Sequence, residues 1–423
     1  MKNVVLNFVR NNREKGLVLA DQGLVSGVNF LVGIILARFL SVELFGLFSL
    51  AWMVIYFASG LQQSFLTAPL FALTVKQKDT SSWFGRLAST QLALSVLSFA
   101  FVFIALEIAY YFQPSWRFSG VTLTLSLLTA VYLFNDFSRR IMFVQNDPEK
   151  ALKIDILGYA LQPVFIGSLY LFDLLELWTA LAAVLAAQVL STLYILLVIR
   201  PNFQYVGIGE TALKLWVYSK YLLATALLQW SSANYIILYA ASILGPAAIG
   251  AIRVSQNLMG VLNVLFQAME NIIPARSAEA LQRGGNQALQ IYIKKITLQL
   301  LIPVILFLGS IALFNEEIIK LIYGEEYVPY SFVLVSFCGI YLFVFLGTLL
   351  RFVIRTLEHN QLIFISYVLT TVFSLLVGKI LASSFGLEGV MIGIAGTQLI
   401  SFLSFIIYLK FKVKWNFRLF TLS

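Results

Sequence analysis

The sequence predicts an all-α, polytopic membrane protein with twelve membrane-spanning helices. Of its 423 residues, 60% are hydrophobic and only 12% are charged, and the mean hydropathy is +0.88. A soluble protein of this composition could not cover its surface with polar groups. Apolar stretches long enough to cross a bilayer core recur along the whole chain. The connections between them are too short to hold a catalytic domain, so we do not expect an enzyme.

The expected spans follow one another in a regular order. We place them at about residues 17–38, 46–72, 87–112, 120–143, 152–172, 178–199, 219–243, 248–273, 291–314, 329–350, 361–383 and 388–410. Most of the 29 lysine and arginine residues fall near the termini and in the even-numbered connections, whereas the odd-numbered connections are acidic. The positive-inside rule then puts both termini, including Lys414 and Arg418, in the cytoplasm. This topology explains the net charge of +9, so we expect no nucleic-acid partner.

Two short turns indicate an internal repeat. Residues 40–46 (LSVELFG) join the first two expected helices, and residues 244–250 (LGPAAIG) join the seventh and eighth, 204 residues later. Both turns begin with leucine and end with glycine. The same offset places Gln63 opposite Gln267. Chance similarity between two short turns is the alternative explanation.

The repeat predicts two lobes of six helices each. Because six is an even number, both halves enter the membrane in the same direction, as in parallel repeats with a substrate site at the interface between the halves. We predict an N-terminal lobe over residues 1–200, a cytoplasmic linker over 201–220 and a C-terminal lobe over 221–423.

The eighth expected helix carries a polar stripe along most of its length. Its members recur at steps of three, four or one, which is the helical period. They are Arg253, Gln256, Asn257, Asn263, Gln267, Glu270 and Asn271. The stripe rises about 27 Å at roughly 1.5 Å per residue, nearly the thickness of a bilayer core, and cannot face acyl chains. It either bonds neighbouring helices or lines a water-filled cavity. We favour the cavity, because bonding between helices needs only one or two such residues.

The chain offers few residues for metal or acid-base chemistry. It has one cysteine and one histidine, which excludes disulfide frameworks, cysteine-based metal sites and most histidine catalysis. His359, between Glu358 and Asn360, is interpreted as a solvated loop residue. We therefore predict no catalytic residue, no metal and no bound cofactor.

Two segments resemble a known family. Residues 37–51 (ARFLSVELFGLFSLA) look like the first hairpin of the bacterial polysaccharide exporters, the O-antigen flippases of the multidrug/oligosaccharidyl-lipid/polysaccharide (MOP) superfamily. Residues 321–327 (LIYGEEY) are similar to the segment that this family carries before its tenth helix. The resemblance implies a MATE-like fold of two six-helix lobes forming a V that opens alternately to each side. Many relatives carry an acid in the seventh helix where this chain has Asn234, so no ion-coupling role is carried over to that helix.

The implied function is a flippase in the bacterial cytoplasmic membrane. It would move a lipid-linked oligosaccharide, a glycan on polyprenyl pyrophosphate, to the outer leaflet for surface polysaccharide biosynthesis. The expected partners are this glycan lipid and membrane lipids, with other polysaccharide-assembly proteins as further candidates. A cation-coupled multidrug exporter of the same superfamily is one alternative, and a membrane enzyme of polysaccharide assembly is another.

A lipid-linked glycan needs cations for its phosphates and amides for its sugars. Guanidinium binds phosphate bidentately, so Arg253 is the candidate phosphate or acidic-sugar contact, and snorkelling to the outer headgroups is its alternative role. The predicted sugar path consists of Gln256, Asn257, Asn263 and Gln267, joined by Ser59, Gln62, Gln63 and Gln229, with Glu270 and Asn271 near the inner end. A salt bridge to Arg276 is the alternative for Glu270.

Three acids inside or near spans are candidates for coupling transport to Na⁺ or H⁺. They are Asp21, Asp136 and Glu107. A buried carboxylate is either paired or protonated. Asp136 has a simpler explanation in local pairs with Arg139 and Arg140 at helical spacing. Asp21 has no such neighbour, so we prefer it as the coupling acid.

Overall fold

The computed structural model describes residues 2–112, 114–116, 120–413 and 415, with side chains from residue 16 onward except that of Ser115. Nearly all of these residues are helical, and no strand occurs among them. The predicted cytoplasmic residues Lys414 and Arg418 lie outside the described residues. By its internal contacts the chain divides into two compact units, Met1–Leu227 and Leu228–Ser423.

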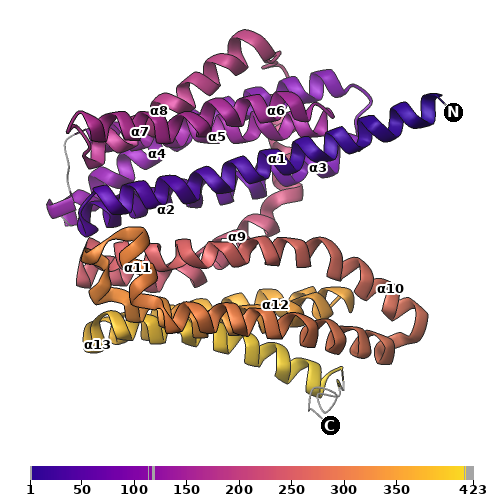
Figure 1. Cartoon of the computed structure of the whole chain (residues 1–423). Coiled ribbons are helices and arrows are strands. Elements are labelled where there is room, and N and C mark those ends of the chain that lie inside the picture. The colour runs from indigo at the N-terminus through magenta and orange to yellow at the C-terminus, as the bar shows by residue number, and fades with distance from the viewer. Residues whose placement is uncertain (1, 113, 117–119, 414, 416–423) are drawn as a thin grey trace. The chain divides into compact units, whose positions relative to one another are not determined.

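The first unit consists of long helices (Figure 1). Several of them are interrupted by a short turn of π- or 3₁₀-helix. Its elements are α1 (Lys2–Phe39), α2 (Val42–Gln62), η1 (Gln63–Thr67), α3 (Ala68–Leu73), η2 (Thr74–Lys76), α4 (Thr80–Phe112), η3 (Pro114–Trp116), α5 (Val121–Val144), α6 (Pro148–Asp155), η4 (Ile156–Ala160), α7 (Leu161–Leu171), α8 (Leu177–Tyr194), η5 (Ile195–Ile199) and the first part of α9 (Ile208–Leu244). The turns η1, η4 and η5 are π-helical, a form that often occurs as a single turn at functional sites.

Local sequence explains where these helices begin. The Ser41 hydroxyl accepts a hydrogen bond from the Leu44 amide at 3.3 Å and so caps α2. Asp147 accepts one from the Lys150 amide at 3.1 Å, and Pro148 occupies the first turn of α6, where a missing N–H costs nothing.

Helix α5 lies at the centre of the first unit, packed against α4 on one side and α8 on another. Beneath it, a buried apolar cluster joins α5 to the helices around it. The cluster includes Leu66, Leu70, Trp83, Leu87, Phe134, Phe137, Ile154 and Leu215. Its largest member, Trp83, donates a hydrogen bond from Nε1 to the Thr74 hydroxyl at 3.0 Å. This core fixes the positions of the polar side chains described below.

The second unit contains the rest of α9, followed by α10 (Pro246–Leu313), α11 (Asn315–Tyr323), the 3₁₀ segment η6 (Glu325–Tyr330), α12 (Ser331–Thr356) and α13 (Asn360–Phe411). Helix α12 packs against both α10 and α13. Helices α10 and α13 are unusually long, at 68 and 52 residues, because each contains two helices that meet at a kink. Gly285 in α10 and Gly386 in α13 have φ values of 62° and 57°, which glycine adopts without strain.

Fewer than twelve separate stretches of spanning length occur among the described residues. Among the described residues, nine helical stretches are long and apolar enough to cross a membrane. Two of these are the kinked helices α10 and α13, each of which covers two expected spans. Helix α9 is not among the nine, because Gln229, Ser231, Ser232 and Asn234 lower its hydropathy. The count of twelve stays a prediction.

The two compact units divide the chain within a helix. The boundary between the compact units falls inside α9, after Leu227, whereas the sequence placed a linker at 201–220. Helix α2 begins at Val42 and α10 begins at Pro246, so both helix starts keep the offset of the two turns. The two helices thus begin at equivalent positions of the two turns.

Candidate functional site

A buried ionic cluster lies in the first unit, where α1, α5 and α6 meet. The Nη1 atom of Arg139 is 2.6 Å from Asp155 Oδ2 and 3.6 Å from Asp21 Oδ2. The side chain of Asp21 is 0% exposed and that of Asp155 is 4% exposed. Neither oxygen of Asp21 accepts a hydrogen bond from a described N–H or O–H group. Two buried carboxylates therefore share one guanidinium, and the closer of the two is Asp155.

A second pair lies beside the first on α5. Arg140 donates a hydrogen bond from Nε to Asp136 Oδ2 at 2.8 Å, across one helical turn. The sequence predicted that Asp136 pairs with a neighbouring arginine, and Arg140 fills that role. Arg139, the other predicted partner, hydrogen-bonds Asp155 instead. The two pairs and Asp21 together hold three carboxylates and two guanidinium groups, which leaves one negative charge in excess when all are ionised.

A layer of neutral polar side chains surrounds these charges. Asn135 donates from Nδ2 to both the side-chain and backbone oxygens of Gln188 at 2.8 Å, and Thr192 donates to Asn135 Oδ1 at 2.8 Å. Tyr159 donates to the Tyr132 hydroxyl at 3.4 Å. Because so many donors and acceptors are paired, α5, α8 and η4 are held in one arrangement around the charges.

A backbone carbonyl in the π-turn η4 closes this layer. The Gly158 oxygen accepts hydrogen bonds from Gln188 Nε2 at 3.1 Å and from Gln162 Nε2 at 2.6 Å. A Cβ atom at Gly158 would lie 3.3 Å from the Gln188 amide, so this position favours glycine. Next to it is a cavity of about 10 Å³, lined by Asp136, Arg139, Asp155 and their polar neighbours. That volume is about the size needed for one water molecule.

Sequence reasoning found Asp21 and Asp136 in this cluster but missed Asp155. Asp155 follows Lys150 and Lys153 and lies inside the expected span at 152–172. The signal that could have identified Asp155 from the sequence is its position near the start of an apolar stretch of spanning length. The third candidate acid, Glu107, lies elsewhere on α4, where it accepts a hydrogen bond from Thr122 at 3.4 Å.

The predicted polar stripe lies on α10 in the second unit. Arg253, Gln256 and Asn257 are partly buried, and Arg253 Nη1 donates to Gln256 Oε1 at 3.2 Å. Asn257 Nδ2 donates to the Tyr323 hydroxyl of α11 at 3.2 Å. The four members further along the helix are exposed: Asn263, Gln267, Glu270 and Asn271. The stripe is thus fixed at one end by side-chain hydrogen bonds and accessible at the other.

The salt bridge between Glu270 and Arg276, given above as the alternative role of Glu270, is wrong because Glu270 has another partner. Glu270 pairs with Arg355 of α12, whereas Arg276 pairs with Glu279 at 3.1 Å. Arg276 lies six residues beyond Glu270, a step that puts the two on different faces of the helix, and Glu279 lies three residues beyond Arg276 on the same face.

The remaining predicted path residues lie on α2, η1 and α9. Gln63 Nε2 donates to the Ser59 hydroxyl at 3.2 Å, so these two form a local pair on one face of the helix. Gln62 points to a different face and is buried against α4 and α5. Gln229 is exposed on α9. A role for these residues in a substrate path stays a prediction.

The sequence profile of the polysaccharide biosynthesis protein family matches residues 35–332, which is more than half of the chain. The chain belongs to this family. Both segments that carried the sequence resemblance, 37–51 and 321–327, lie inside the match, so the predicted membership is confirmed. A search of curated proteins finds no match to this chain.

Solved structures of low sequence identity share the fold of this polysaccharide biosynthesis protein. The lipid II flippase MurJ, in an inward closed conformation, has a TM-score of 0.67 at 13% identity, covering 96% of this chain and 89% of that one. An inward-facing multidrug resistance MATE transporter of the MOP superfamily has a TM-score of 0.61 at 19% identity, covering 91% and 93%. A MOP superfamily transporter from Pyrococcus furiosus has a TM-score of 0.57 at 18% identity, covering 96% and 95%. These likenesses confirm the predicted all-α, MATE-like membrane fold.

Proposed function

We propose that this protein flips a lipid-linked oligosaccharide, a glycan on polyprenyl pyrophosphate, across the bacterial cytoplasmic membrane by alternating access. Its family supports a role in polysaccharide biosynthesis, and one protein of the same fold is named a lipid II flippase. The proposal involves no covalent chemistry. Both termini are cytoplasmic in this proposal, in keeping with the distribution of lysine and arginine.

The observation that carries the proposal is the polar stripe on α10. Four consecutive members, from Asn263 to Asn271, are exposed on a helix that belongs to a membrane fold. Glu270 is paired with Arg355, but the amides on such a surface are stable only where they meet water or polar ligands. A sugar head offers many hydroxyl groups to amides, whereas a drug-like cation would favour an apolar surface with a carboxylate. The stripe therefore supports a glycan cargo over a multidrug cargo.

The first test asks whether the stripe meets water. In a Cys338→Ala background, cysteines at Asn263 and Gln267 are expected to react with a small, membrane-impermeant thiol reagent, because thiolates form in water and not in hydrocarbon. The control is a cysteine at Val264, an apolar residue between them that is also exposed. We expect rates about tenfold higher at the two polar positions. Equal reaction rates at all three positions would contradict a water-filled path along the stripe.

The second test measures transport. Purified protein in vesicles is expected to move a fluorescent polyprenyl-pyrophosphate oligosaccharide between leaflets, followed by its loss of access to an impermeant glycosidase. Arg253→Ala should slow flipping about tenfold or more, because a charge-assisted hydrogen bond to phosphate contributes about 1.5–3 kcal/mol. Lys379→Ala, an exposed basic residue on α13, is the matched control and should flip at the parent rate. Vesicles that export a cationic dye but leave the glycan lipid in place would favour the multidrug alternative.

The proposal includes a coupling cation, H⁺ or Na⁺, at Asp21. Its support is the excess negative charge of the cluster around Arg139, in which Asp155 takes the nearer position. A buried carboxylate without full pairing is neutralised by a proton or a cation. Glu107 and Asp136 are weaker candidates, since each has a hydrogen-bond donor within reach on its own or a neighbouring helix.

A further inference from the structure

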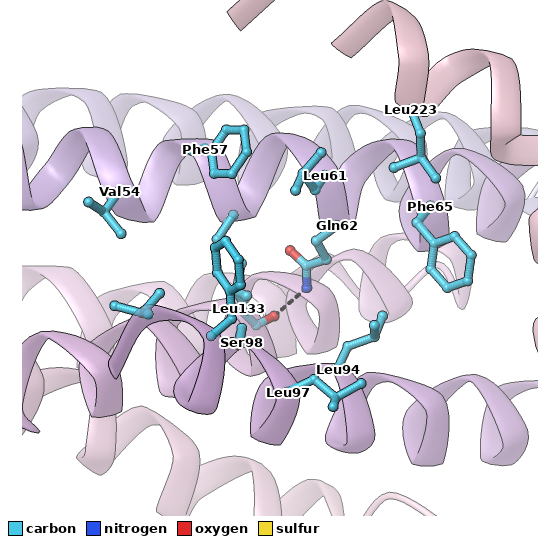
Figure 2. A pocket seen from close by; sticks show the side chains of 13 residues that line it. Val54, Phe57, Leu61, Gln62, Phe65, Leu94, Leu97, Ser98, Leu133 and Leu223 are labelled. Carbon is cyan, nitrogen blue, oxygen red and sulfur yellow. Dashed lines mark hydrogen bonds between the residues drawn. The ribbon is translucent and has the colours of Figure 1, made fainter. Parts of the chain in front are cut away.

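An apolar pocket of about 330 Å³ lies in the first unit, away from the ionic cluster. It is bounded by α2 and η1, α4 and α5, with Leu223 of α9 at one end (Figure 2). Phe57, Leu61 and Phe65 line it from α2 and η1, and Leu94 and Leu97 line it from α4. Phe101 of α4 also lines the pocket. The volume is at the lower end of the range for small-ligand sites, about 300–1,000 Å³. We call it the α2–α4 pocket.

The pocket is open to the lipid side of α4. Leu97 and Phe101 line it and are nevertheless 63% and 61% exposed. The neighbouring residues Val96 and Ile104 on α4 are exposed and apolar as well. In a membrane fold, such a continuous apolar surface faces hydrocarbon. A ligand therefore enters this pocket sideways from the bilayer, and its chemistry is that of a hydrocarbon chain.

The polar donors of the pocket side chains are hydrogen-bonded within the protein. Gln62 is 4% exposed, and its Nε2 donates to Gln91 Oε1 at 2.8 Å and to the Leu133 carbonyl at 2.6 Å, as Figure 2 shows for the latter. The Ser98 hydroxyl donates to the Ser95 carbonyl at 2.8 Å. No described donor reaches the buried Oε1 atom of Gln62. The pocket thus offers an occupant apolar surface, aromatic rings and no free donor, which excludes a phosphate or sugar head.

Helix α2 separates this pocket from polar side chains of the predicted path. At about 100° per residue, Ser59 lies on nearly the opposite side of α2 from Phe57 and Leu61, and Gln63 at the start of η1 hydrogen-bonds to Ser59. A substrate with a polar head and a hydrocarbon tail needs two such surfaces, because the head must cross in water while the tail stays in an apolar environment. One helix presents both.

We propose that the α2–α4 pocket holds part of the isoprenoid tail of the carrier lipid while its head group crosses the membrane. This inference rests on the proposed function. The tail of the carrier lipid is preferred over a bulk acyl chain because α2 carries the predicted path residue Ser59 on its opposite face, so one amphiphile can occupy both surfaces. Three phenylalanine rings (Phe57, Phe65 and Phe101) give the pocket a large apolar contact area.

The test is photolabelling of the full-length protein in vesicles of phosphatidylethanolamine and phosphatidylglycerol. The probe is polyprenyl phosphate with a diazirine on its tail, and a diazirine phospholipid is used in parallel. We expect the isoprenoid probe to label peptides of α2 and α4, and excess unlabelled polyprenyl phosphate to compete. Ala58→Phe, which fills the pocket, should lower labelling about tenfold, since it displaces apolar contact comparable to one large aliphatic side chain.

The matched control is Ala100→Phe, the same change at an exposed position on α4 that does not line the pocket, and its labelling should equal that of the parent. If Ala58→Phe lowers the melting temperature, Ser98→Leu fills the pocket from α4. Equal labelling by the phospholipid probe, or labelling that survives both filling variants, overturns the inference. Labelling measures tail binding alone. A protein that flips the glycan lipid but is not labelled in α2 and α4 therefore contradicts this inference. A protein that is labelled but does not flip the glycan lipid contradicts the proposed function.

Discussion

Replacing Arg139 with glutamine is expected to destabilise the protein strongly, because the change strands two buried carboxylates. The guanidinium of Arg139 is paired with both Asp155 and Asp21, and both carboxylates are almost fully buried. Removing one partner of a buried ion pair leaves an uncompensated charge, which typically costs about 3–5 kcal/mol. We expect a corresponding fall in the free energy of unfolding, measured by denaturant titration in detergent with tryptophan fluorescence.

Two comparisons make this result specific. Arg276→Gln removes an exposed arginine, 65% exposed, from a pair with Glu279 and should cost no more than about 1 kcal/mol. Combining Arg139→Gln with Asp155→Asn removes one of the stranded carboxylates, so it should be more stable than Arg139→Gln alone. If Arg139→Gln and Arg276→Gln are equally stable, the cluster around Arg139 does not hold α1, α5 and α6 together in the way that the distances indicate.

The fold was largely predictable because its strongest determinants are local. Long apolar stretches mark the helices, and Ser41 and Pro148 mark where two of them begin. The expected spans at 120–143 and 178–199 agree with α5 and with α8 plus η5 to within a residue. The full length of α10 was harder to predict. Its polar segment after Pro274 has good helix formers, so the helix continues past the apolar stretch until Gly284 and Gly285 bend it.

The candidate site was less predictable, because its contacts join different helices. Helical spacing gave the pair of Asp136 with Arg140, which is local. Spacing could not give the bond from Arg139 to Asp155, sixteen residues further on, because it depends on how α5 and α6 pack. The same limit applies to Gln62. Its neighbour Gln63 has a similar sequence environment, yet the packing of α4 and α5 decides that Gln62 is the buried one.

Replacing Asp21 with asparagine is expected to separate transport from its driving ion. Asp21 is the carboxylate of the cluster that lies farther from Arg139, and neither of its oxygens accepts a hydrogen bond from a described donor. It is therefore the group on which the excess negative charge of the cluster falls, and the one that a proton or cation would neutralise. Asparagine has nearly the same shape and carries no charge, so the variant should remain folded.

The measurement is flipping of the polyprenyl-pyrophosphate oligosaccharide in vesicles with an imposed pH or sodium gradient. One pH unit supplies about 1.4 kcal/mol per proton, so coupled flipping by the parent should respond by up to about tenfold. Asp21→Asn should flip at one rate whether or not the gradient is present. Glu149→Gln is the control, because Glu149 is an exposed acid outside the cluster, paired with Lys153 at 3.1 Å, and its loss should leave the response to the gradient intact. If Asp21→Asn still responds to the gradient, the coupling site lies elsewhere. If Glu149→Gln responds to the gradient and Asp21→Asn does not, the coupling site is Asp21 of α1.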